Sequence, residues 1–154
     1  MSTALVAVGN PLMGDEGIGI QIIEWFWKHP KMTQTFDCLE ISGSLFELID
    51  LVSHYSKIIF VDCAFMGALP GKLRRFQISH IQSLKTSSPF SLHSNDLIDD
   101  LQTALTLNAN ATDSIILYGI EPAYVGPRPS LSHDLFEKIP LYAQTILQDF
   151  DQRI

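Results

Sequence analysis

The chain has 154 residues, of which 46% are hydrophobic and 18% are charged, and its formal net charge at pH 7 is −7. This length and balance indicate one globular domain, residues 1–154, and argue against a disordered chain. The acidic charge argues against a nucleic-acid partner, because affinity for phosphate backbones depends on clustered Lys and Arg side chains.

No basic segment precedes the first apolar stretch, and no apolar run approaches the roughly 20 residues that a membrane span needs. The two cysteines, Cys38 and Cys63, lack CxxC spacing, as is typical of reduced thiols in the cytosol. We therefore expect a cytoplasmic protein that has no membrane partner and is monomeric on its own.

Apolar runs and helical periodicities alternate along the first half of the chain. A buried strand is predicted at 3–8, where the apolar run breaks at Gly9-Asn10-Pro11, and a helix follows at 15–28. The same alternation predicts a second strand at 35–41, a helix at 44–54 and a third strand at 57–61.

The second half continues this alternation. It predicts a strand at 72–78, a polar loop at 79–92, a helix at 95–107 with Ser94 as its N-cap, a strand at 114–119, a loop at 122–129 and a helix at 132–150. Such alternation predicts a three-layer α/β/α sandwich around a mostly parallel, twisted sheet. Because no helix precedes it, the strand at 72–78 is expected to run antiparallel at an edge.

A glycine-rich turn, residues 9–19, connects the first strand to the first helix, where a nucleotide loop would lie. A dinucleotide fingerprint starting at Gly17 fails at Ile22, and a P-loop starting at Gly9 fails because Asp15-Glu16 replace its Lys and Ser/Thr. Two carboxylates at a helix start repel phosphate and satisfy the helix dipole themselves. The turn therefore favours a cationic ligand, although Asp15 as an N-cap and Glu16 as a first-turn acid remain an ordinary alternative.

Three side chains of metal-ligand type are expected at one rim of the sheet. With a strand order of 2-1-3, the loop that carries Glu16 faces the end of the third strand, which Asp62 follows. His93 directly precedes a predicted helix start and would reach the same rim. One imidazole and two carboxylates suit Ni²⁺ or Zn²⁺ and leave coordination positions open. Taken singly, Asp62 could be a turn former and His93 an ordinary surface histidine.

The chain resembles the hydrogenase maturation endopeptidases. The resemblance extends over most of the chain and rests on these segments, in order: Gly9-Asn10-Pro11-Leu12, Asp15-Glu16-Gly17-Ile18-Gly19, Val61-Asp62-Cys63-Ala64, Ser91-Leu92-His93 and Gly119-Ile120-Glu121-Pro122. The first two segments form one specific motif, whereas the segments around Asp62 and His93 indicate the family only in combination with that motif.

The resemblance implies an endopeptidase that removes the C-terminal extension of a hydrogenase large-subunit precursor. It implies that Glu16, Asp62 and His93 bind nickel that the precursor supplies, so that cutting follows metal insertion, and that no organic cofactor takes part. Family members often carry an acidic loop with glycine and threonine after the second strand, whereas this chain has Glu40-Ile41-Ser42-Gly43-Ser44. The class of hydrogenase therefore stays open, and Gly43 is equally well explained as a turn glycine.

Two catalytic routes remain open for this group. The metal could polarise the scissile carbonyl or activate water, or it could serve recognition alone, with Asp62 or Glu16 as general base. The sequence contains no HExxH motif, and Cys63 is interpreted as a packed thiol rather than a nucleophile. The same ligands would also suit a non-catalytic nickel-binding accessory protein or a metallohydrolase that keeps its own metal.

Overall fold

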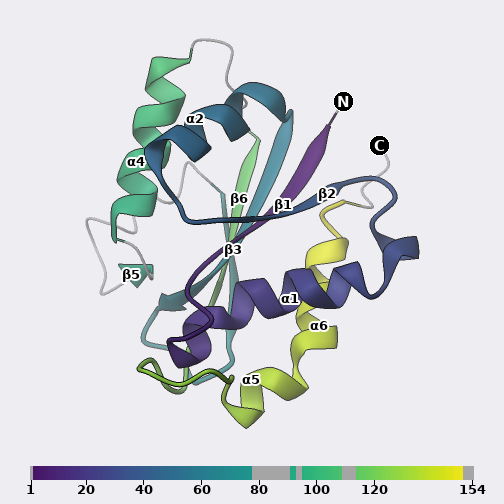
Figure 1. Cartoon of the computed structure of the whole chain (residues 1–154), viewed down its shortest axis with the longest axis vertical. Helices are drawn as coiled ribbons and strands as arrows, with labels where there is room; N and C mark the ends of the chain where they lie inside the picture. The colour runs from purple at the N-terminus through teal and green to yellow at the C-terminus, as the bar shows by residue number, and fades with distance from the viewer. Residues whose placement is uncertain (1, 78–90, 93–94, 109–113, 151–154) are drawn as a thin grey trace.

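The computed structural model of the chain describes residues 2–77, 91–92, 95–108 and 114–150. Figure 1 shows a central sheet with helices on both faces, the three-layer α/β/α sandwich expected from the sequence. None of the helices in these ranges has the length and apolar character that a membrane crossing requires.

The sheet has the strand order β2-β1-β3-β6-β4. Its strands are β1 (Thr3–Val8), β2 (Asp37–Ile41), β3 (Lys57–Phe65), β4 (Leu73–Gln77) and β6 (Ile115–Ile120). All neighbours pair in parallel except β4, which runs antiparallel to β6 at the edge. The order 2-1-3 and the antiparallel edge strand are thus confirmed.

Strand β3 extends further than predicted. It continues beyond Val61 to Phe65, and there it pairs antiparallel with the two-residue strand β5 (Ser91–Leu92). The apolar run predicts a strand that ends at Val61, with Asp62 after it as a turn former or a functional acid. In the structure Asp62 is an internal residue of β3, in register with Gly119 of β6.

Two hydrophobic clusters lie on opposite faces of the sheet. Alternate residues of β1 divide between them, with Ala4, Val6 and Val8 on one face and Leu5 and Ala7 on the other. The helices α2 (Leu45–His54) and α4 (Asn95–Leu107) cover the first face, while α1 (Ile18–Trp27) and α6 (Ile139–Leu147) cover the second (Figure 1). Burial on both faces explains why the strands read as continuous apolar runs.

Two predicted helices differ from the structure. The helix expected at 15–28 begins with a 3-10 turn, η1 (Gly14–Gly17), and a second short turn, η2 (Pro30–Met32), follows α1. The C-terminal helix expected at 132–150 is split at Lys138 into α5 (His133–Glu137) and α6. Pro140 explains the split, because proline has no N–H to continue a helix and fits the first turn of a new one.

Helix α1 packs closely against the sheet through Gly19. A Cβ on Gly19 would lie 2.7 Å from the carbonyl oxygen of Val61 in β3 and 3.4 Å from the Cβ of Ala7 in β1. The backbone of Val61 cannot yield easily, since it belongs to the sheet. Gly19 therefore sets the distance between the start of α1 and the strands that carry the site described below.

An ionic cluster around the buried Asp149 connects the segment after α6 to the other end of the sheet. Asp149 accepts hydrogen bonds from Arg75 at 2.9–3.2 Å and from the Tyr118 hydroxyl, and its carbonyl oxygen accepts from Lys57. Burial alone would raise the pKa of Asp149, but the hydrogen bonds from Arg75 and Tyr118 outweigh it and hold that pKa below its ordinary 3.8. The ionised carboxylate therefore stabilises the fold.

We predict that Gly19→Ala destabilises the protein. Alanine gains about 1 kcal/mol over glycine in helix propensity, but overpacking against a fixed backbone costs about 1–3 kcal/mol, so the net effect is a loss. Urea denaturation measures it, with Gln21→Ala in the same helix as the control. A free energy of unfolding above the wild-type value would show that α1 moves away from the sheet at little cost.

We predict that Asp149→Asn lowers the free energy of unfolding at neutral pH by about 1–3 kcal/mol. A carboxylate with a lowered pKa contributes its stability above the unfolded-state pKa and loses it as the pH falls through the folded-state pKa. The gap between wild type and variant should therefore be constant near neutrality and close below about pH 4. A gap that persists unchanged in acid would contradict an electrostatic origin.

Candidate active site at the carboxyl end of the sheet

Glu16 and Asp62 lie together beyond the ends of β1 and within β3. Both carboxylates are buried, with exposed fractions of 8% and 0%. Gly9 makes their approach possible, because a Cβ at this position would lie 2.1 Å from the carbonyl oxygen of Glu16 and 3.8 Å from Oδ1 of Asp62. Gly9 also has φ of +149°, which side-chain-bearing residues rarely adopt. The two acids thus occupy the same rim, as the strand order predicts.

The Asp62 carboxylate is incompletely compensated. Its Oδ1 accepts the backbone N–H of Cys63 at 2.7 Å, while its buried Oδ2 has no hydrogen-bond partner within the described part of the chain. Burial raises the pKa of Asp62 well above its ordinary value, the Cys63 N–H lowers it, and the negative charge of Glu16 raises it further. A cation placed between the two acids would relieve both the desolvation and the repulsion.

Cys63 does not take part as a nucleophile in this arrangement. Its side chain is fully buried within the cluster under α1. Burial raises the pKa of the Cys63 thiol, and the negative charges of Asp62 and Glu16 raise it further, so the thiolate is disfavoured. This agrees with the interpretation of Cys63 as a packed thiol.

His93, the third predicted ligand, lies outside the described residues, as do Ser94 and residues 79–90 of the loop expected at 79–92. The prediction of a loop is wrong at its end, because Ser91–Leu92 form β5. Its neighbour in sequence, Leu92, pairs with Ala64, two residues beyond Asp62. Among the residues that are described, no group of three or more His, Cys, Asp or Glu side chains is arranged to hold a metal ion. The described part of the site is therefore the pair Glu16 and Asp62.

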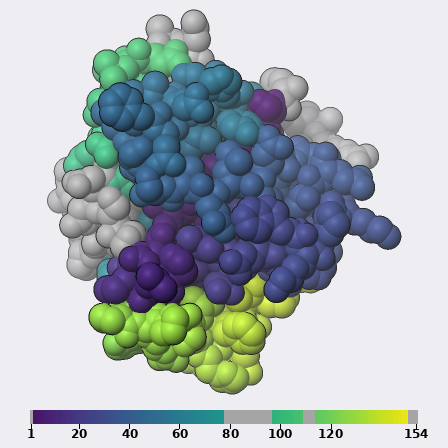
Figure 2. Space-filling model, viewed as in Figure 1, coloured from purple at the N-terminus to yellow at the C-terminus, as the bar shows by residue number. Residues whose placement is uncertain are grey.

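Asp15 plays a role that the sequence pattern did not reveal. Instead of capping a helix, its fully buried carboxylate accepts the N–H groups of Ala123, Tyr124 and Ser132 and the Ser132 hydroxyl, at 2.7–2.9 Å. It thereby joins the turn after β1 to the loop between β6 and α5. Figure 2 shows these two segments, purple and yellow-green, in contact on the surface.

Glu121 is a second structural acid at the same rim. Its carboxylate accepts the backbone N–H groups of Met66 at 2.7 Å and Ala68 at 3.0 Å, and so holds the turn between β3 and β4. In the sequence, Glu121 shows the same pattern as Asp62, because each is an acid that directly follows an apolar run. Sequence alone did not separate the two roles, since they depend on which backbone donors converge on each carboxylate.

Gly43 lies in the turn between β2 and α2. Its φ of +91° is in the region that favours glycine, and Ser44 then caps α2 together with Glu47 in a capping box. The turn interpretation of Gly43 accounts for this conformation.

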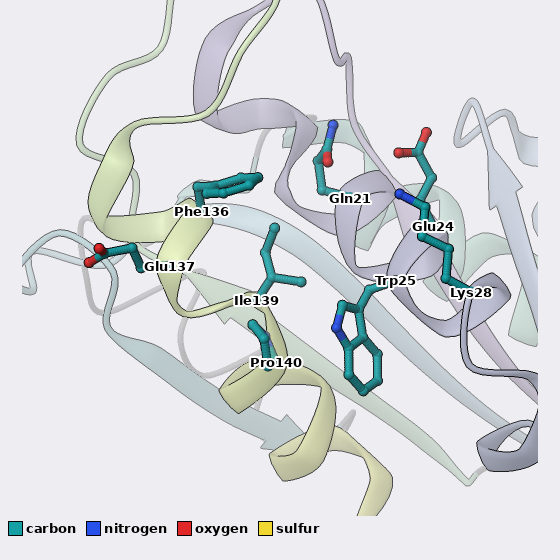
Figure 3. A pocket seen from close by; sticks show the side chains of 8 residues that line it. All are labelled: Gln21, Glu24, Trp25, Lys28, Phe136, Glu137, Ile139 and Pro140. Atoms are coloured by element: carbon teal, nitrogen blue, oxygen red, sulfur yellow. The ribbon is translucent and has the colours of Figure 1, made fainter.

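A separate groove of about 320 Å³ lies between α1 and the α5–α6 junction (Figure 3). Its apolar lining residues are Trp25, Phe136, Ile139 and Pro140. Neither Glu16 nor Asp62 lines it. The groove is therefore distinct from the acidic rim.

Known proteins resemble this chain in sequence and in fold. It is 28% identical over 130 residues to the hydrogenase 3 maturation protease of Escherichia coli strain K12, covering 82% of this chain and 76% of that protein. It is 24% identical over 118 residues to the hydrogenase expression/formation protein HupD of Thiocapsa roseopersicina, covering 77% of this chain. The chain spans only 53% of the length of that relative.

Solved structures give the same fold. The [NiFe] hydrogenase maturation protease HybD from Thermococcus kodakarensis aligns with a TM-score of 0.82 at 18% identity, covering 98% of this chain and all of that one. The model of the hydrogenase maturation protease family matches residues 31–149, and the matched stretch contains Asp62 and begins after the Glu16 turn. This match covers most of the chain, so the protein belongs to the hydrogenase maturation protease family.

Proposed function

We propose that this protein is an endopeptidase that removes the C-terminal extension of a nickel-loaded hydrogenase large-subunit precursor. We propose further that Glu16, Asp62 and His93 bind the nickel that the precursor carries. The observation that supports this most strongly is the pair of buried carboxylates at one rim, with Oδ2 of Asp62 buried and unbonded within the described residues. A buried carboxyl group with an unbonded oxygen, next to a second buried acid, favours the binding of a cation.

The donor set fits nickel and an incoming partner. Carboxylate oxygens with an imidazole nitrogen suit a borderline divalent ion, and three protein ligands leave positions for donors that belong to the precursor. The position of Leu92 beside β3 supports His93 as the third ligand, because the two residues are adjacent in sequence.

Catalysis would then follow from positioning. By holding a metal that is already fixed in the precursor, Glu16 and Asp62 orient the adjoining peptide at the rim, and orientation of this kind supplies a large share of many rate enhancements. When bound, the metal also supplies a Lewis acid for a carbonyl or for water.

We expect the reaction to occur in the cytoplasm with the enzyme as a monomer. Both cysteines are free, and Cys38 and Cys63 lie in different strands. Reduced thiols of this kind fit a compartment in which disulfides do not persist.

We predict that the wild-type enzyme shortens nickel-loaded precursor and leaves nickel-free precursor intact. Glu16→Gln keeps the shape of the side chain and removes one charge, so this variant should slow processing at least about 10-fold. His93→Ala removes a proposed nickel ligand and should abolish processing without unfolding the protein. Electrophoresis of the large subunit under equal enzyme concentrations measures this.

Glu24→Gln in α1 is the matched control and should process at the wild-type rate. Equal cleavage of both precursors would refute recognition through the metal. Nickel binding without any cleavage would identify a nickel-binding accessory protein instead of a protease.

We also predict that Asp62→Asn is more stable than the wild type and inactive. Asparagine keeps the acceptor for the Cys63 N–H and has no acid to ionise, so it avoids the free-energy cost that burial and Glu16 impose on the Asp62 carboxyl group at neutral pH. This should raise the free energy of unfolding of the metal-free protein by about 1–3 kcal/mol. Urea denaturation at neutral pH measures this, with the exposed Asp50→Asn as the control. A less stable Asp62→Asn would mean that the carboxylate is compensated in the folded state, contrary to the strain described above.

A further inference from the structure

The turn after β1 and the loop between β6 and α5 are joined along their length. The backbone N–H of Arg128 donates to the carbonyl oxygen of Leu12 at 3.0 Å, and the N–H of Gly14 donates to the carbonyl oxygen of Arg128 at 2.8 Å. The N–H of Asp15 donates to the carbonyl oxygen of Tyr124 at 2.9 Å. The four hydrogen bonds to the Asp15 carboxylate add to this pairing. The two segments therefore form one unit.

Glycine makes the contact between these segments close. A Cβ on Gly14 would lie 2.8 Å from the carbonyl oxygen of Tyr124, and φ of Gly14 is +64°. A side chain at position 14 would therefore collide with the backbone and the ring of Tyr124, which lies 3.0 Å from the same point. Asp15 then turns its carboxylate into the second loop, and the next residue in sequence is Glu16.

Glu16 is consequently fixed from two sides. Its backbone lies against Gly9 at the end of β1, and its peptide link to Asp15 is anchored through that residue's carboxylate to the 123–132 loop. We propose that Asp15 is a positioning residue, which sets the place of the Glu16 carboxylate relative to Asp62. This inference rests on the proposed function, since it assigns Asp15 a part in presenting the nickel-binding acids.

The charge of Asp15 is required by its donors. Three hydrogen-bond donors, the N–H groups of Ala123 and Tyr124 and the hydroxyl of Ser132, converge on Oδ2, while the N–H of Ser132 meets Oδ1. An asparagine would direct its NH₂ group toward at least one of these donors in either orientation. A carboxylate accepts from all of them.

A purely structural role for Asp15 predicts a loss of stability only. Asp149 offers the comparison, because it is also a buried, hydrogen-bonded carboxylate, and it lies near Lys57 at the opposite end of β3. Asp62 lies five positions after Lys57 in this strand, a span of about 17 Å. Asp149→Asn should therefore weaken the fold without displacing Glu16.

The test measures kcat and KM for processing of nickel-loaded precursor, per folded molecule, in Asp15→Asn, Ser132→Ala, their double variant and Asp149→Asn. We expect kcat to fall about 10-fold or more in Asp15→Asn, by a smaller factor in Ser132→Ala, and no further in the double variant than in Asp15→Asn alone. Asp149→Asn should retain kcat within about two-fold.

Wild-type kcat and KM in Asp15→Asn, or an equal loss of kcat in Asp149→Asn, would overturn the inference. If Asp15→Asn does not fold, Ser132→Ala decides, and an unchanged kcat in that variant overturns it.

Amide hydrogen exchange separates this inference from the proposed function. In Asp15→Asn the amides of Gly14, Glu16 and Arg128 should exchange at least about 10-fold faster, whereas in Asp149→Asn they should not. Inactive wild-type enzyme together with this exchange pattern would refute the proposed protease and keep Asp15 as the residue that positions Glu16. Unchanged exchange in Asp15→Asn would refute the positioning role whatever the activity.

Discussion

The carbonyl group of Glu16 occupies the space in which any residue other than glycine at position 9 would place its side chain. The remaining geometry of the rim depends on this contact. The turn after β1 folds back on the strand. Within this turn, Gly17 packs directly against the backbone of Pro11, where a side chain would not fit, and Gly19 allows α1 to lie close to β3. A buried carboxylate is thereby brought beside Asp62 instead of projecting into solvent.

Three of the four buried acids at this rim, Asp15, Asp62 and Glu121, show how similar residues acquire different roles. Asp15 and Glu121 each accept backbone N–H groups from a neighbouring loop. These hydrogen bonds compensate their charges, so both carboxylates stabilise the positions of the loops. Asp62 receives one N–H, from the next residue in its own strand, and keeps an unbonded oxygen within the described residues. The difference lies in the backbone donors, which come from segments far away in sequence.

This difference explains how far the sequence could predict the structure. The alternation of strands and helices and the mostly parallel sheet follow from apolar periodicity and from the rules of βαβ units. The shared rim of Glu16 and Asp62 follows once the strand order 2-1-3 is assumed. The continuation of β3 past Asp62 and the pairing with Ser91–Leu92 depend on a partner that no local pattern specifies. The split at Lys138 was accessible, since Pro140 stands in the sequence as a helix-start signal.

The internal position of Asp62 in β3 also bears on how the protein responds to heat or denaturant. A site side chain on a surface loop loses its position when the loop opens locally, and such opening has a free energy far below that of global unfolding. Asp62 is flanked by β6 in a strand whose residues are almost all buried. Its backbone is therefore released only when the central sheet itself comes apart, so this half of the site should keep its geometry up to the cooperative melting of the domain.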